Sequence, residues 1–143
     1  MKRLLLSLVA VMLMVAPVFA EKQDKEYGDV KFLTSMEKGQ FLASTLMDKP
    51  VYLTDGEMVP ESVTEVPVGW ASVSDISDCV VTRDGKIKGL LFDVGGFLGI
   101  GTRTVAASMN AVKFVDIAEV DEFLVVLPKM TMEDIEAAPE FEF

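Results

Sequence analysis

From Phe41 onward the chain consists of short apolar runs, broken about every 8 to 12 residues by turn-forming residues. This pattern is typical of small β-sandwiches and barrels, because each run is long enough for one strand and each turn reverses the chain. The sharpest turn signal is Asp84-Gly85, since Asp and Gly adopt the positive φ angles of a tight hairpin at low cost. The sequence predicts a mostly β fold with strands in residues 51–53, 73–82, 87–94, 104–107, 112–115 and 123–127.

The end of the chain carries helix signals instead. The Thr131 hydroxyl can cap a helix, and Met132 and Ile135 then lie on one face. Pro139 prevents the helix from continuing. We therefore expect a short C-terminal helix of about two turns.

The first 20 residues read as a cleavable secretory signal. Lys2 and Arg3 precede an apolar run over residues 4–16, interrupted only by Ser7, and Ala20 is a small residue at the expected cleavage site. The run is shorter than the roughly 20 apolar residues that span a bilayer. We expect an exported product, periplasmic if the source is Gram-negative, without stable membrane insertion after cleavage. Residues 21–40 are charged and lack sustained apolar periodicity, which predicts a flexible lead-in to a domain at 41–141.

Composition excludes most familiar reactions. The chain has no histidine and one cysteine, Cys79, so Ser/His/Asp triads, Cys/His pairs and His-ligated metals are absent from a single chain. An internal disulfide is excluded as well, and Cys79 reads as a small core residue that would permit a linked dimer if it were exposed. We expect no enzyme activity, no catalytic residue, no metal and no cofactor.

The net charge limits the classes of partner that the chain can bind. The formal net charge is −10, and removing Lys2 and Arg3 with the leader leaves 11 basic residues against 23 acidic ones, about −12. Nucleic acid and anionic lipid are therefore disfavoured as partners, because both would meet like charge.

Read in order, these pieces resemble the PRC-barrel family, the small β-barrel of the H subunit of photosynthetic reaction centres and of a bacterial ribosome-maturation factor. The resemblance is carried by residues 43–52, the strand at 70–82 with Asp75 and Asp78, the hairpin at 83–87, the glycine-rich run at 93–101 and the tail at 132–141. It implies a strongly bent barrel that often acts as a docking module, and it implies no reaction. The chain departs from the family at residues 102–104, where a charged pair is usual, and in its longer segment at 57–69.

The glycine-rich run does not fit a phosphate-binding loop. The GxxxxGK[ST] pattern is absent, and a GxGxxG motif starting at Gly99 would need a glycine where Thr104 stands. Glycines at such places more simply allow a bulge or a tight bend between strands. We interpret Gly85, Gly95, Gly96, Gly99 and Gly101 as structural glycines.

Phe97, Leu98 and Ile100 interrupt this run with apolar side chains. An apolar loop tip either folds into the mouth of the barrel or contacts a partner, because loops run over surfaces. Trp70 at a strand start either fills the core or stacks on a ligand. Our hypothesis is that these four residues bind a partner, with residues 57–69 as an adaptable rim.

The sequence thus predicts a non-catalytic, exported binding or adaptor module of the cell envelope. Its partner would be another envelope protein or a second copy of the chain. The alternative is a carrier that holds a small apolar ligand in the barrel mouth near Trp70.

Overall fold

The structure, a computed structural model, describes residues 25–96 and 101–143, so the predicted signal at residues 1–20 lies outside it. The chain divides into two compact units, Met1–Gln40 and Phe41–Phe143. In the first unit β1 (Lys25–Tyr27) and β2 (Val30–Phe32) pair antiparallel, with Gly28 at φ 64° in the turn. The sequence predicts a flexible lead-in here, and the two-residue Gly28-Asp29 turn between the strands is the local signal for the hairpin.

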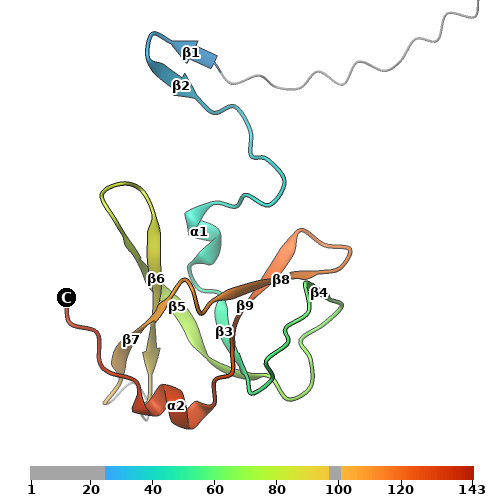
Figure 1. Cartoon of the computed structure of the whole chain (residues 1–143), viewed down its shortest axis with the longest axis vertical. Coiled ribbons are helices and arrows are strands. Elements are labelled where there is room, and N and C mark those ends of the chain that lie inside the picture. Colours follow the sequence, from blue (N-terminus) through green and yellow to red (C-terminus); the bar gives the residue numbers. More distant parts are fainter. Residues whose placement is uncertain (1–24, 97–100) are drawn as a thin grey trace, which may run out of the picture. The chain divides into compact units, whose positions relative to one another are not determined.

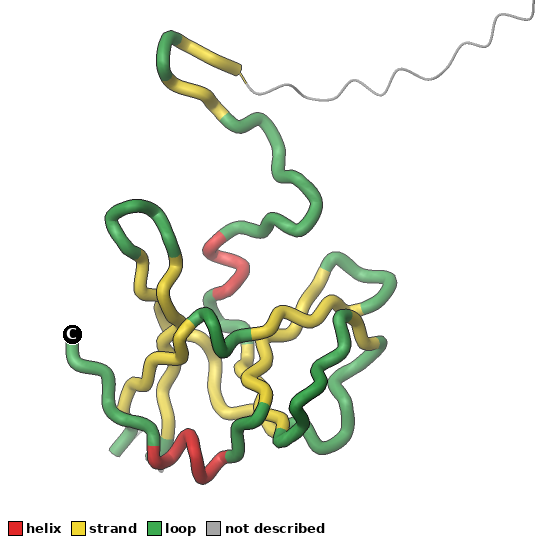
Figure 2. Tube along the Cα trace, viewed as in Figure 1, coloured by secondary structure: helices red, strands yellow, loops and turns green. Residues whose placement is uncertain are grey.

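The second unit is one seven-stranded sheet with two short helices (Figures 1 and 2). The strands pair in the order β4-β8-β9-β3-β5-β6-β7, and all pairs are antiparallel except β3–β9 and β4–β8. The elements are α1 (Ala43–Leu46), β3 (Pro50–Thr54), β4 (Ser62–Val63), β5 (Ala71–Val81), β6 (Ile87–Val94), β7 (Arg103–Ser108), β8 (Lys113–Ile117), β9 (Glu122–Pro128) and α2 (Met132–Ala137). The predicted mostly β fold and the C-terminal helix are confirmed.

The predicted hairpin joins β5 to β6. Gly85 has φ 84°, and its amide donates to the Thr82 carbonyl at 2.9 Å. The Thr82 amide donates to the Lys86 carbonyl at 2.8 Å, which closes the turn. Hydrogen bonds from Thr82 and Lys86 lower the pKa of the Asp84 carboxyl. Local turn chemistry therefore fixes the reversal where the sequence predicts it.

The sheet does not close into the small, strongly bent β-barrel that the family resemblance implies. In the described residues β4 and β7 are the two ends of the strand order, and no pairing joins them. β4 is only two residues long, so it offers few backbone groups to a further strand. The edge of β7 is partly occupied by the C-terminal tail, because the Phe141 amide donates to the Thr104 carbonyl at 2.8 Å. The sheet therefore stays open.

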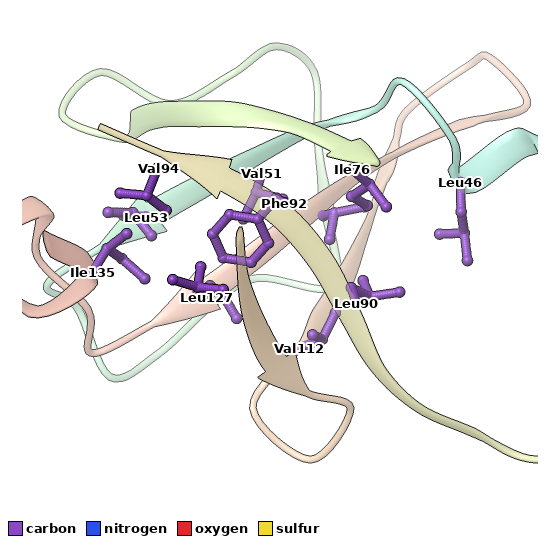
Figure 3. Close-up of a cluster of buried hydrophobic side chains, with 12 residues drawn as sticks. Leu46, Val51, Leu53, Ile76, Leu90, Phe92, Val94, Val112, Leu127 and Ile135 are labelled. Atoms are coloured by element: carbon purple, nitrogen blue, oxygen red, sulfur yellow. The ribbon is translucent and has the colours of Figure 1, made fainter. Parts of the chain in front are cut away.

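The main core lies on one face of this sheet and is closed by α2 (Figure 3). Val51 and Leu53 of β3, Phe92 of β6 and Leu127 of β9 are each at most 2% exposed, and Ile135 of α2 packs among them. Burial of these apolar side chains is the main source of stability for the domain.

Two sets of contacts hold α2 in this position. At its N-terminus Thr131 and Asp134 form a capping box, in which the Asp134 amide donates to the Thr131 hydroxyl at 3.2 Å and the Thr131 amide donates to the Asp134 carboxylate at 2.9 Å. At its C-terminal end the guanidinium of Arg103 on β7 donates to the carbonyls of Ile135, Glu136 and Ala138. Arg103 thus adds hydrogen bonds to carbonyls at the end of the helix, where the Ile135 carbonyl also accepts one from the Ala138 amide at 3.1 Å.

A second, smaller cluster lies on the opposite face of β8 and β9. Val115, Leu124 and Val126 are buried there. Tyr52, Val59, Val63, Trp70 and Ile117 pack against them. β9 is consequently covered on both faces, which explains why residues 123–127 are an uninterrupted apolar run rather than an alternating one.

Candidate functional site

The cover over this second cluster is a single stretch of chain, residues 55–70, which we call the covering segment. It leaves the sheet after β3 and returns at the start of β5. These two strands are neighbours, with Leu53 opposite Ala71, so both ends of the segment lie at the same place on the sheet. The sequence predicts an irregular loop over residues 57–69, and only the two residues of β4 within it are regular.

Several contacts along its length hold the covering segment against the sheet. Near its start the Lys129 amide donates to the Gly56 carbonyl at 3.3 Å, and the Lys129 ammonium pairs with the Glu57 carboxylate at 2.5 Å. In its middle β4 pairs in parallel with β8, and the amide of Ala118 donates to the Val63 carbonyl at 2.7 Å. Trp70 anchors its end in the second cluster. The segment is therefore a fixed part of the domain surface.

The covering segment has two chemically different sides. Its inner side places Val59, Val63 and Trp70 against the sheet. Its outer side carries Met58 at 92% exposure and Val68 at 105%. Side chains this exposed make no use of the core, so the covering segment presents two exposed apolar residues on a fixed support.

Trp70, one of the residues predicted to bind a partner, is half-buried. It packs within the second cluster, and its amide donates to the Pro67 carbonyl at 3.2 Å. The packing accounts for the indole without a ligand. A contact between Trp70 and a partner stays a prediction.

The glycine-rich run joins β6 to β7, whose ends meet at the pair Val94 and Arg103. Gly95, Gly96 and Gly101 have φ angles of 77°, 85° and 80°, in the left-handed region that favours glycine. These angles support the structural role predicted for the three glycines. Phe97, Leu98, Gly99 and Ile100 lie outside the described residues, so the partner contact predicted there stays a prediction.

The structure also shows a cluster that the sequence does not indicate. The rings of Phe41, Phe114 and Phe123 lie with centroids 4.7 to 5.4 Å apart. The Lys49 ammonium is 4.7 Å from the Phe123 ring centroid and 2.7 Å from the Glu122 carboxylate. These residues come from distant parts of the chain, so no local spacing could have revealed them. Their mutual packing gives the cluster a structural role.

In residues 25–96 and 101–143 no group of three or more potential ligands is placed to hold a metal ion. The two carboxyls whose pKa is lowered, Asp84 and Asp134, owe this to a turn and to a helix cap. Cys79 on β5 is half-buried against the main core. No helix in the described part of the chain is both long and apolar enough to cross a membrane.

No family model matches the chain, and no curated protein matches it. The candidate site therefore depends on the geometry of the covering segment and on the residues of the glycine-rich run.

Proposed function

We propose that this chain is a non-catalytic, exported binding module of the cell envelope, built on a PRC-barrel-like domain. Support for the family comes from the order of elements: the hairpin between β5 and β6, the glycine turn between β6 and β7, and α2 stand at the residues that carry the resemblance. The open sheet departs from a closed barrel of that family.

The observation that carries the binding function is the outer side of the covering segment. Met58 and Val68 are almost fully exposed, on a segment that is anchored near both ends and in its middle. An apolar contact held in place before binding loses little conformational entropy when the partner arrives, which favours affinity. We assign these two residues to a contact surface, and we keep the contact of Phe97, Leu98 and Ile100 with a partner as a separate proposal from the sequence.

In-cell crosslinking of the tagged full chain, followed by recovery from the envelope fraction, tests this function. We expect a defined crosslinked partner with the wild type and its loss in the double variant Met58→Ser/Val68→Ser. The matched control is Val81→Ser/Met132→Ser, which removes apolar side chains that are 55% and 38% exposed on β5 and on α2, away from the covering segment. Equal loss in both double variants, or no loss in either, would contradict the assignment of the surface.

A second measurement distinguishes the binding module from the alternative function, a carrier of a small apolar ligand. A protein that carries an apolar ligand near Trp70 should retain extra mass in native mass spectrometry of the freshly purified chain. A bare mass together with a captured partner would favour the binding module.

A further inference from the structure

The covering segment that carries the two exposed apolar residues also carries several acidic residues. Residues 55–70 contain four acids and no lysine or arginine, namely Asp55, Glu57, Glu61 and Glu65. All four side chains are exposed. Glu57 pairs with Lys129, whereas no ion pair within the described residues engages the other three. The covering segment therefore combines two exposed apolar side chains with a net negative charge.

A second copy of this chain fits this surface poorly. A symmetric dimer through the covering segment would place the same patch on both sides, so its acids would face one another. Like charges across an interface cost several kcal/mol. An anionic membrane or a nucleic acid would meet the same repulsion.

Building on the proposed function, we propose that the covering segment binds a basic amphipathic segment of a partner protein. Apolar side chains of the partner would contact Met58 and Val68, and its lysines or arginines would lie beside Glu61 and Glu65. The apolar contacts supply most of the affinity, and the opposite charges select the partner and speed association. Such a partner should bind less tightly as ionic strength rises, because these carboxylates are exposed and screened by salt.

Trp70 provides the readout, because it is the single tryptophan of the chain and lies at the end of the covering segment. The probes are synthetic peptides without tryptophan, roughly 18 residues or about five helical turns long. The first peptide is designed as an amphipathic helix with leucines on one face and lysines on the other. In the second peptide every lysine of the first is replaced by glutamate, and in the third every leucine is replaced by serine. We expect the leucine–lysine peptide to bind the full chain and shift the Trp70 emission, and we expect the other two to bind at least about tenfold more weakly.

Two pairs of variants locate the binding. Met58→Ser/Val68→Ser should weaken binding of the leucine–lysine peptide about tenfold, whereas the control Val81→Ser/Met132→Ser should not. Glu61→Gln/Glu65→Gln should weaken it about fivefold at low salt and less at high salt. Its control is Glu136→Gln/Glu140→Gln, which makes the same change in net charge at exposed positions elsewhere.

The outcomes separate this inference from the proposed function. If the remote glutamate control weakens binding as much as Glu61→Gln/Glu65→Gln, the attraction reflects net charge and the inference fails. If the leucine–glutamate peptide binds as tightly as the leucine–lysine one, the preference for a basic partner fails while the apolar contact surface stands. If no peptide binds, the inference is overturned, and the crosslinking experiment decides the proposed function on its own.

Discussion

Two segments cover the two faces of the sheet, and they do so by different means. α2 closes the main core with a capped helix of six residues, and the covering segment closes the second cluster with a largely irregular stretch. The start of the helix is set by neighbours in sequence, since Thr131 and Asp134 cap it, and its end contacts one distant residue, Arg103. The covering segment is defined by distant residues, among them Lys129 and β8.

This difference determines which segment can offer a binding surface. α2 has one large side chain, Ile135, that is buried, and its remaining residues are solvated. The covering segment buries its inner side chains and leaves large apolar ones outside. A short helix on a surface directs its apolar side chains to one face, whereas an irregular backbone can direct apolar side chains both inward and outward. Variants that truncate the buried side chain of α2 or of the covering segment, one at a time, test this comparison between the two segments.

The largest effect should come from Ile135→Ala, which removes the only buried side chain of α2 from the main core. Ile135 is 3% exposed, and truncation of such a residue costs about 2–5 kcal/mol of unfolding free energy. Urea denaturation followed by circular dichroism measures the loss. Met132→Ala on the same helix is the control, because Met132 is 38% exposed and should cost clearly less. Equal losses would show that α2 is not held by its buried face.

A smaller effect is expected for Trp70→Ala, which loosens the covering segment from the second cluster. The side chain is half-buried, so we expect about 2 kcal/mol, below the roughly 3–5 kcal/mol of a fully buried tryptophan. The same denaturation experiment applies, with Val68→Ala as control, since Val68 is fully exposed and should change stability by no more than about 0.5 kcal/mol. If Trp70→Ala were as neutral as its control, the segment would not depend on its anchor and its outer side would not be a fixed surface.

The sequence predicts those parts of the molecule that local chemistry determines. The Asp84-Gly85 turn, the Thr131 cap and the strand runs all appear where their signals lie. The open sheet could not be predicted, because closure depends on whether β4 and β7 meet, and β4 is set by pairing with a strand some 50 residues away. The inner and outer sides of the covering segment were equally hidden, since valines occur on both. Only the tertiary contacts show that Val63 packs against the second cluster while Val68 is exposed.

The smallest expected effect tests the local cap of α2. Hydrogen bonds from the Thr131 side chain and backbone lower the pKa of Asp134 below its usual 3.8. The folded state therefore binds this proton less readily than the unfolded state, so the contribution of Asp134 to stability is present above pH 3.8 and is lost as pH falls through the lower folded-state pKa. Thr131→Ala should cost about 1 kcal/mol of unfolding free energy at neutral pH and raise the pKa of Asp134 toward its usual value.

Asp134→Asn should destabilise the domain at neutral pH, and the difference in stability between this variant and the wild type should shrink in acid. Glu133→Gln, which makes the same charge change in the same turn without a capping bond, separates the cap from the helix dipole. A titration of the Asp134 carboxyl by NMR in wild type and Thr131→Ala measures the shift directly, and identical pKa values in both proteins would show that the capping box does not hold α2 in solution.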